Sequence, residues 1–400
     1  MTNSGDGRNH ALATLALCFL VAMLEGHNLQ STGIAASRMG ASLHISKSAL
    51  GEVFSIGSLG LLPGAMLGGR FADRWGRKKV LLMATLLFGL FSLLTARVEN
   101  TAMLMLARFM TGAGLGAALP NLIALATEAV EPGHRSRAVA FMYAGVPLGG
   151  VMAALTSNAV TGAEGWRSIF LVGGAVSLVL LLPIALFMPE SRAYLRDRGE
   201  HRVSSAPIMQ VLFGEGRANI TIALWVSYFF TLAVVYLLLN WLPSLLEERG
   251  LARPQAGVVQ IMFNIGAAVG SLAFGWLLDQ GARRLSVILM YAGVVASLLA
   301  LAVPWSFDGL RVAGFAGGLF VVGGQLVLYA LAPMFYASAM RGTGVGSAVA
   351  AGRLGAVAGP LVAGVILSAG WSGDMVLFAA IPGIVVAGSA AITLGTGRRC

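Results

Sequence analysis

The sequence predicts an all-α integral membrane protein with twelve transmembrane helices in two six-helix halves. Its 400 residues are 57% hydrophobic and only 11% charged, whereas a soluble domain carries about 25% charged residues. Apolar runs long enough to cross a hydrocarbon core about 30 Å thick recur along the whole chain. Backbone groups in lipid must pair within helices or a closed barrel, and the period-2 pattern of a barrel is absent, so we expect helices.

Twelve apolar runs are the expected spans, and one long polar segment divides them into two sets of six. We therefore expect an N-terminal half over residues 1–188, a cytoplasmic linker over 189–216 and a C-terminal half over 217–400. The expected spans are residues 12–36, 49–69, 80–97, 101–126, 137–159, 167–188, 218–243, 255–278, 286–304, 309–332, 343–368 and 372–394.

Membrane topology explains the net charge of +10 better than a nucleic-acid-binding surface does. Most Lys and Arg residues lie in alternate short loops, such as residues 70–79 and 192–217. Because cytoplasmic loops are enriched in these residues, the bias places both termini in the cytoplasm. The expected surroundings are the lipid bilayer, with no nucleic acid as partner.

Residues that could carry enzyme chemistry are scattered along the chain. The five His residues lack metal-ligand spacing, Cys18 and Cys400 form no cluster, and nucleotide-binding motifs are absent. We therefore expect no catalytic residue, no metal and no cofactor. A membrane sensor of the same fold would need a soluble appendage, which the short loops and tails do not provide.

The loops after the second and eighth spans repeat one pattern. Residues 69–78 and 275–284 share Gly, Asp, Arg and a second cation at the same offsets. Such a repeat indicates a six-plus-six duplication with a binding site between the halves at mid-membrane.

These loops also contain candidate gating residues. Asp73 can accept from the N-terminal amides of a neighbouring helix, and Arg77 can pair with Glu128 at the end of the fourth span. Asp279 and Arg283 are their counterparts in the second half. A solvated turn that merely follows the positive-inside bias is the alternative.

Charges inside apolar spans need an explanation, because each costs at least about 2.5 to 3.5 kcal/mol there. Glu25 lies near the middle of the first span, with Asn28 and Thr32 on the same face. Burial disfavours the charged form of a carboxylate, as a proton carrier requires. The alternative is a structural Glu bonded to a neighbouring helix.

Two arginines also lie within spans. Arg353 is near the middle of the eleventh span and can grip a carboxylate in bidentate fashion or pair with a buried acid such as Glu25. Arg108, in the fourth span, can contact substrate or form a structural pair.

Polar and aromatic residues mark a possible binding face. Tyr236 and Asn240 in the seventh span share a face with Trp225 and Phe229, and Gln325 and Tyr329 form an i, i+4 pair in the tenth. Gln260 and Asn264 are a further pair in the eighth span. Packing or lipid-facing aromatics are the alternative reading.

Residues 69–81 match the G-x-(L/F)-A-D-R-x-G-R-K-x-x-L loop, so the chain resembles the major facilitator superfamily. More narrowly, the stretches 60–64, 112–121, 240–243, 325–333 and 344–360 resemble the aromatic acid:proton symporters. That resemblance implies a bacterial inner-membrane symporter that takes up an aromatic carboxylate with protons, an arylpropionate such as 3-(3-hydroxyphenyl)propionate, by alternating access.

The resemblance also implies roles for single residues. It makes Glu25 the proton-coupling group and Arg108 and Arg353 the basic residues of the fourth and eleventh helices. The family pattern (D/E)-G-x-D is here Glu25-Gly26-His27-Asn28, so an amide replaces the second acid and puts the proton stoichiometry or the substrate in doubt. A proton-driven exporter of drugs or other organic solutes is the alternative, since residues 145–150 partly match an antiporter motif.

Overall fold

The computed structural model describes residues 4–191, 194–195, 208–214, 217–336 and 340–396. The described part contains twelve helices long and apolar enough to cross a membrane, which confirms the predicted number and class. The chain divides into two compact units, Met1–His201 and Arg202–Cys400. The domain limits proposed from the sequence remain a prediction, and most of the linker lies outside the described residues.

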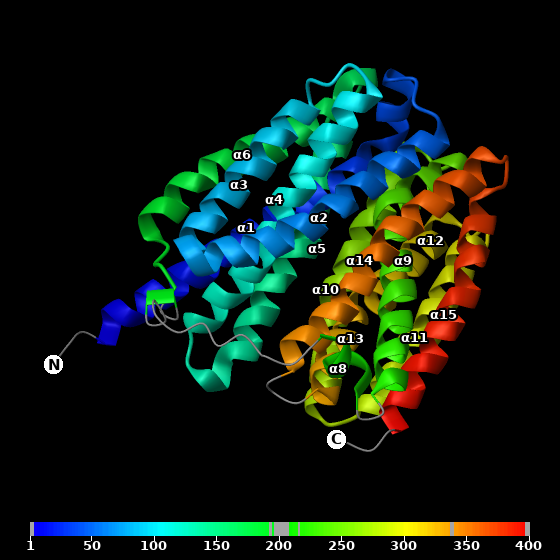
Figure 1. Cartoon of the computed structure of the whole chain (residues 1–400). Helices are drawn as coiled ribbons and strands as arrows, with labels where there is room; N and C mark the ends of the chain where they lie inside the picture. Colours follow the sequence, from blue (N-terminus) through cyan, green and yellow to red (C-terminus); the bar gives the residue numbers. More distant parts are fainter. Residues whose placement is uncertain (1–3, 192–193, 196–207, 215–216, 337–339, 397–400) are drawn as a thin grey trace. The chain divides into compact units, whose positions relative to one another are not determined.

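The first unit consists of six long helices, drawn blue to green in Figure 1. Several of their ends are marked by a capping side chain or by a glycine. Ser46 and Asn100 cap α2 and α4 by accepting from backbone amides, and Gly76, with φ of 99°, separates α2 from α3. The helices are α1 (Ser4–Ser42), α2 (Lys47–Trp75), α3 (Arg77–Thr95), α4 (Thr101–Glu128), α5 (Arg135–Ala159) and α6 (Trp166–Phe187).

The second unit has six further spans and a short helix before them. Its elements are α8 (Ile208–Phe213), α9 (Ala218–Glu248), α10 (Arg253–Asp279), α11 (Arg283–Ala302), α12 (Phe307–Gly317), α13 (Gln325–Leu331), α14 (Arg341–Ser368) and α15 (Gly373–Thr396). The expected span 309–332 is not one α-helix. Residues Gly318–Gly323 form a π-helical turn between α12 and α13. Glycines at both its ends and on either side of it, Gly317 and Gly324, weaken the regular hydrogen-bond ladder there.

Glycines bring pairs of helices into close contact within each unit. A Cβ atom on Gly112 of α4 would lie 2.0 Å from the Gly57 carbonyl oxygen of α2, and one on Gly355 of α14 would lie 2.0 Å from the Phe229 oxygen of α9. Gly112 and Gly116, like Gly355 and Gly359, are four positions apart on one helix face, and this small-xxx-small spacing serves helix packing. Neither helix pair could approach so closely with any larger residue.

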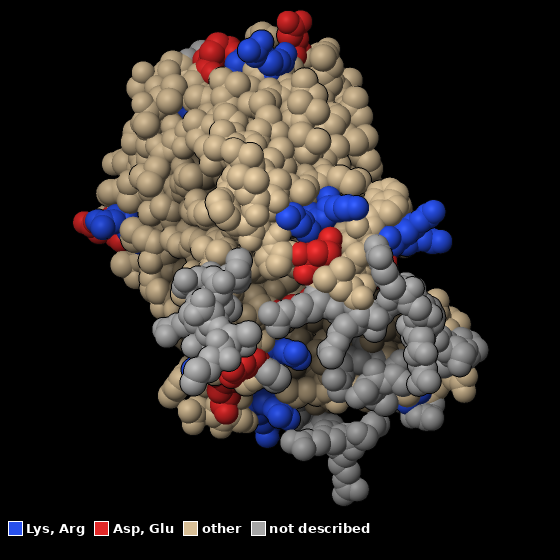
Figure 2. Space-filling view, turned by 90° about the vertical axis from the view of Figure 1, so that its left-hand side faces the viewer, with Lys and Arg blue, Asp and Glu red and all other residues tan. Residues whose placement is uncertain are grey.

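The exposed surface of the spans is apolar. Figure 2 shows a face with a broad uncharged expanse and with Lys, Arg, Asp and Glu gathered at its upper edge and in its lower part. Exposed side chains in mid-helix include Leu86, Val179 and Val385. This is the pattern of helices that are solvated by lipid tails.

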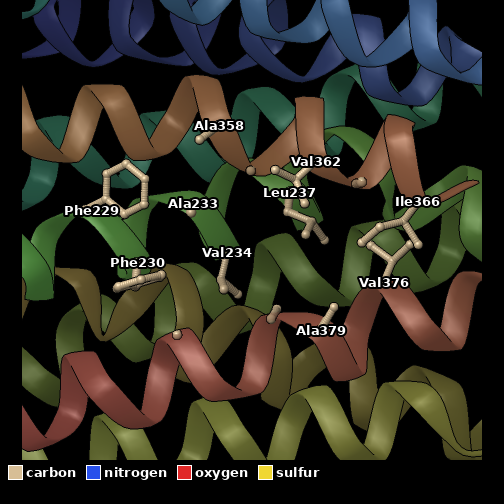
Figure 3. A pocket seen from close by; sticks show the side chains of 14 residues that line it. Phe229, Phe230, Ala233, Val234, Leu237, Ala358, Val362, Ile366, Val376 and Ala379 are labelled. Carbon is tan, nitrogen blue, oxygen red and sulfur yellow. The ribbon is translucent and has the colours of Figure 1, made fainter.

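An apolar pocket of about 190 Å³ lies in the second unit between α9, α14 and α15. Figure 3 shows Phe229 and Leu237 of α9 on the side of Ala358 and Val362 of α14, and Phe230 on the side of α15. None of the polar residues predicted for the binding site lines this pocket. Phe229, expected on the binding face, thus contributes to an apolar space.

Candidate functional site

The polar stripe of α1 is buried inside the first unit. The exposed fractions are 7% for Glu25, 0% for Asn28 and 3% for Thr32. These residues share one helix face because they are three and four positions apart. The structure therefore places the predicted proton-coupling carboxylate inside a helix bundle.

Arg108 of α4 reaches this stripe. Its Nη2 atom donates to the backbone oxygen of Asn28 at 2.9 Å, and its guanidinium lies 5.6 Å from the centre of the Phe170 ring of α6. The Asn28 amide itself donates to Leu24 O at 2.8 Å. Arg108 is only 4% exposed, and its Nη1 atom meets no acceptor among the described residues. A buried guanidinium with an open donor can hold an anionic or carbonyl oxygen.

His27 is a buried polar residue that the sequence reasoning did not select. Its Nε2 atom lies 2.9 Å from the Ile169 carbonyl oxygen of α6, and Gly173 leaves room for the ring. Its Nδ1 atom has no partner among the described residues. The only sequence signal was its position between Glu25 and Asn28, because the contact with α6 joins residues 142 positions apart.

A second polar group lies in the second unit around Arg353 of α14. The Arg353 Nη1 atom donates to the Tyr236 hydroxyl of α9 at 2.6 Å. The Asn240 side-chain amide donates to the Tyr236 carbonyl at 2.7 Å. The structure thus brings three predicted site residues together, with the arginine oriented by a phenol.

The predicted pair on α13 also interacts within the second unit. The Gln325 amide donates to the Tyr329 hydroxyl at 3.0 Å, and the Tyr329 ring packs edge-on against Tyr228. Trp225, expected on the same face as Tyr236, instead donates its indole N–H to the Ser347 hydroxyl at 3.0 Å. Arg353 and Glu25 belong to different units, and their predicted alternative pairing remains a prediction.

The predicted gating loop forms a network at the end of the first unit where α6 runs into the linker, here called the linker end. Arg77 pairs with Glu128, and Glu128 also accepts from the Ser191 hydroxyl at 3.0 Å. Glu190 accepts from the backbone N–H of Lys78 at 3.0 Å and of Ser191 at 2.9 Å. The sequence reasoning missed Glu190 and Ser191, which follow the last apolar residue of α6 without a recognisable pattern.

Unlike Arg77, Asp73 and the second-unit counterparts Asp279 and Arg283 do not take part in such a network of described residues. Asp73 is exposed and makes no hydrogen bond or ion pair with a described residue, while Glu190 accepts from the Lys78 amide in the first turn of α3. Asp279 and Arg283 likewise have no such partner among the described residues. The contact expected for Asp73 within its own unit is therefore made by another carboxylate.

The opposite end of the first unit is held by a second set of polar contacts. Glu164 accepts from the Ser42 hydroxyl at 2.7 Å and from the Arg167 Nε atom at 2.5 Å. These hydrogen bonds, with that of Ser42 the larger cause, lower the pKa of Glu164. The buried Arg38 donates to Ser157 of α5 and to Val160, the residue after that helix. These contacts fasten α1 to the neighbouring helices.

Twelve apolar helices with buried polar groups in both units define a membrane transporter. The chain belongs to the Major Facilitator Superfamily, whose sequence profile matches residues 15–252 and 224–396. It is 49% identical to the 3-(3-hydroxy-phenyl)propionate transporter of Escherichia coli K12, over 97% of this chain and 94% of that protein. It is 35% identical to a gallate transporter of Pseudomonas putida, over 89% and 85% of the two chains.

Solved structures show the same fold at low sequence identity. The xylose transporter XylE from E. coli matches with a TM-score of 0.76 at 17% identity, covering 96% of this chain and 95% of that one. The nucleoside transporter NupG matches with a TM-score of 0.75 at 14% identity, covering 98% and 100%. The relatives in sequence and in structure are transporters rather than enzymes.

Proposed function

We propose that the protein is a proton-coupled symporter that imports an aromatic carboxylate by alternating access. An arylpropionate such as 3-(3-hydroxyphenyl)propionate is the proposed substrate, since the relative that is 49% identical carries that name. The observation that carries the coupling mechanism is the buried carboxylate of Glu25 in the middle of a membrane span. The proposal includes no cofactor other than the coupling proton.

Glu25 is the proposed proton carrier. A carboxylate that is 7% exposed loses most of its hydration, which makes its charged form costly. Proton binding and release at Glu25 therefore change the energy of the conformation that buries it. Transport is coupled if the change between the outward-open and inward-open states is easier with proton and substrate both bound than with either of them alone. Asn28, in place of a second acid, leaves Glu25 as the carboxylate of this stripe.

Arg353 is the proposed ligand of the substrate carboxylate. It is partly exposed, one of its nitrogens donates to Tyr236, and a guanidinium has the planar donor geometry that suits a carboxylate. Arg108 is more deeply buried and binds the α1 backbone, so its proposed role is to hold α1 beside Glu25. Tyr236, Asn240, Gln325 and Tyr329 are proposed to surround the ring.

The proposed location is the bacterial inner membrane, with both termini in the cytoplasm. In this orientation the linker end lies at the cytoplasmic face. Arg77, Glu128 and their network are proposed to close the substrate path there. The exporter alternative loses part of its basis, because Gly145 and Gly149 of the antiporter-like stretch pack against the backbone of Phe19 and Met23 in α1. Helix packing explains these glycines.

Uptake into proteoliposomes tests the proposal. Labelled 3-(3-hydroxyphenyl)propionate should accumulate when the outside is more acidic than the lumen, and a protonophore should abolish this accumulation. An aliphatic carboxylate of similar length serves as the substrate control. Flux that is identical with and without the pH gradient, or net export from intact cells, would contradict the proposal.

A further inference from the structure

An open apolar groove lies between α3 and α6, which run side by side in the first unit (Figure 1). Its volume is about 470 Å³, within the range of about 300 to 1,000 Å³ for ligand sites. All its lining side chains are apolar, among them Leu82, Met83, Leu86, Leu178, Leu182 and Ala185. This groove contains none of the residues proposed for proton or substrate binding.

The groove follows from how the two helices cross. Near their middle they are close, since a Cβ atom on Gly174 would lie 2.8 Å from the Gly89 carbonyl oxygen. Toward the linker end, leucines replace glycines on the facing surfaces and hold the helices apart. Met83 is 47% and Leu182 is 66% exposed, so the space opens toward lipid.

Two lysines stand at the linker end of this groove. The Lys78 Nζ atom donates to the Ala185 carbonyl oxygen at 2.7 Å, and an ammonium has two more N–H donors to offer. Lys79 is exposed and makes no ion pair with a described residue. Because Lys78 and Lys79 precede Leu82 and Met83 by four positions each, they share the helix face that lines the groove.

The carboxylates nearby are engaged elsewhere or face solvent. Glu190 accepts from the backbone N–H groups of Lys78 and Ser191, and Glu128 is paired with Arg77. Asp73, at the end of α2, is exposed. The mouth of the groove therefore combines an apolar channel with cationic groups at the level where a span leaves the membrane.

We propose that this groove binds one anionic phospholipid of the leaflet at the linker end, the cytoplasmic leaflet in the proposed orientation. One acyl chain lies along the leucines between α3 and α6, and the phosphate accepts from Lys78 and Lys79. A zwitterionic lipid would bring its own cation to the lysines and bind less well. The apolar pocket between α9, α14 and α15 has no Lys or Arg in its lining, and no such preference is expected there.

Native mass spectrometry of the purified protein tests the headgroup contact. Phosphatidylglycerol and phosphatidylcholine with the same acyl chains are titrated, and the protein should retain one phosphatidylglycerol at concentrations where phosphatidylcholine is lost. Lys79→Gln should weaken phosphatidylglycerol binding about fivefold, the effect of one basic residue near an anionic lipid. Arg284→Gln, which removes an exposed cation from the second unit, is the control and should leave binding unchanged.

Bulky substitutions test the acyl-chain contact. Leu182→Trp and, separately, Met83→Trp should fill the groove and remove the tightly held lipid. Val179→Trp, also on α6 but outside the groove lining, should keep it. Only variants that elute and unfold like the unmodified protein are compared, and the two groove variants are independent. Equal retention of both lipids, an equal effect of Lys79→Gln and Arg284→Gln, or lipid retained in the Trp variants would overturn the proposal.

Discussion

At the scale of single residues, a phenol helps to orient Arg353. A tyrosine hydroxyl at 2.6 Å fixes one nitrogen of the guanidinium without neutralising its charge. A neutral acceptor such as this hydroxyl does not compete with an anionic substrate for the positive charge. The Arg353–Tyr236 contact is therefore compatible with the proposed binding of an anionic substrate.

Arg353→Lys and Tyr236→Phe should both weaken substrate binding, to different extents. Lysine loses the bidentate geometry, so KM should rise about tenfold or more, since a hydrogen bond to a charged group contributes about 1.5 to 3 kcal/mol. Phenylalanine removes only the orienting contact, and KM should rise about fivefold. Tyr291→Phe, which loses a bond to Thr231 outside the proposed site, is the control in the uptake assay. An unchanged KM in both site variants would reject the role of Arg353.

Glu25→Gln should separate proton coupling from substrate movement. The amide keeps the size of the side chain but binds no proton, so accumulation driven by a pH gradient should be lost while exchange of labelled for unlabelled substrate continues. Glu52→Gln on α2, an exposed position, is the matched control and should retain accumulation. Gradient-driven uptake that survives in Glu25→Gln would reject the carrier role.

The sequence identified charged residues of the candidate site more readily than their partners. Glu25, Arg108 and Arg353 stand out because charges are rare inside apolar runs. Their contacts could not be derived, since Arg353 and Tyr236 are 117 positions apart and Arg108 meets a backbone oxygen that any residue would supply. His27 escaped notice for the same reason, because its partner is the Ile169 carbonyl.

At the scale of helices, glycine spacing determines which pairs pack most closely. Gly355 faces the α9 backbone, whereas a Cβ atom on Gly346 of the same helix would meet no atom within 4 Å. Gly355→Ala should therefore destabilise the protein by about 1 to 3 kcal/mol, the usual cost of overpacking. Gly346→Ala should be neutral or slightly stabilising, because Ala favours helices more than Gly does. Equal melting temperatures of the two variants in detergent would contradict this account.

The link made by Glu164 between α1 and α6 should make stability depend on pH. The Ser42 hydroxyl and the Arg167 guanidinium lower the pKa of Glu164 in the folded protein. Its ionised carboxylate therefore stabilises the fold fully above the unfolded-state pKa of about 4.3, and this stabilisation is lost as pH falls through the lower folded-state pKa. Glu164→Gln should thus lower Tm at pH 7 and approach the unmodified protein in acid. Ser42→Ala should show a smaller form of the same trend. A Tm difference that stays constant across this range would exclude the link.

The span over residues 307–335 shows the limit of prediction at this scale. Its apolar length predicted a transmembrane helix, and the span is present. The π-helical turn at Gly318–Gly323 was not predicted, because glycines there are compatible with tight packing, a kink or a wide turn. Contacts of Gly318 with Phe263 and of Gly323 with Gly270, far away in sequence, accompany this turn.

At the scale of the whole molecule, the number of spans and the repeated loops were predictable, because each is a pattern carried by many residues together. Hydropathy over about twenty positions outweighs single exceptions, and the repeat at 69–78 and 275–284 fixes the six-plus-six order. The polar networks at the ends were not predictable, since they depend on which loop side chains meet. The network of Glu128, Glu190 and Ser191 is an example.

The membrane orientation gives a prediction for the whole chain. Because basic loops face the cytoplasm, single cysteines at Lys79 and Arg284 should react with an impermeant maleimide only after the cells are permeabilised. Cysteines at Arg97 and Asp308, at the opposite ends of their units, should react in intact cells. All four positions are exposed, and Cys18 is buried, so a Cys400→Ser background leaves little competing signal. The reverse labelling pattern would show that both termini lie outside the cytoplasm. It would then contradict the proposed leaflet for the bound lipid and the proposed direction of transport.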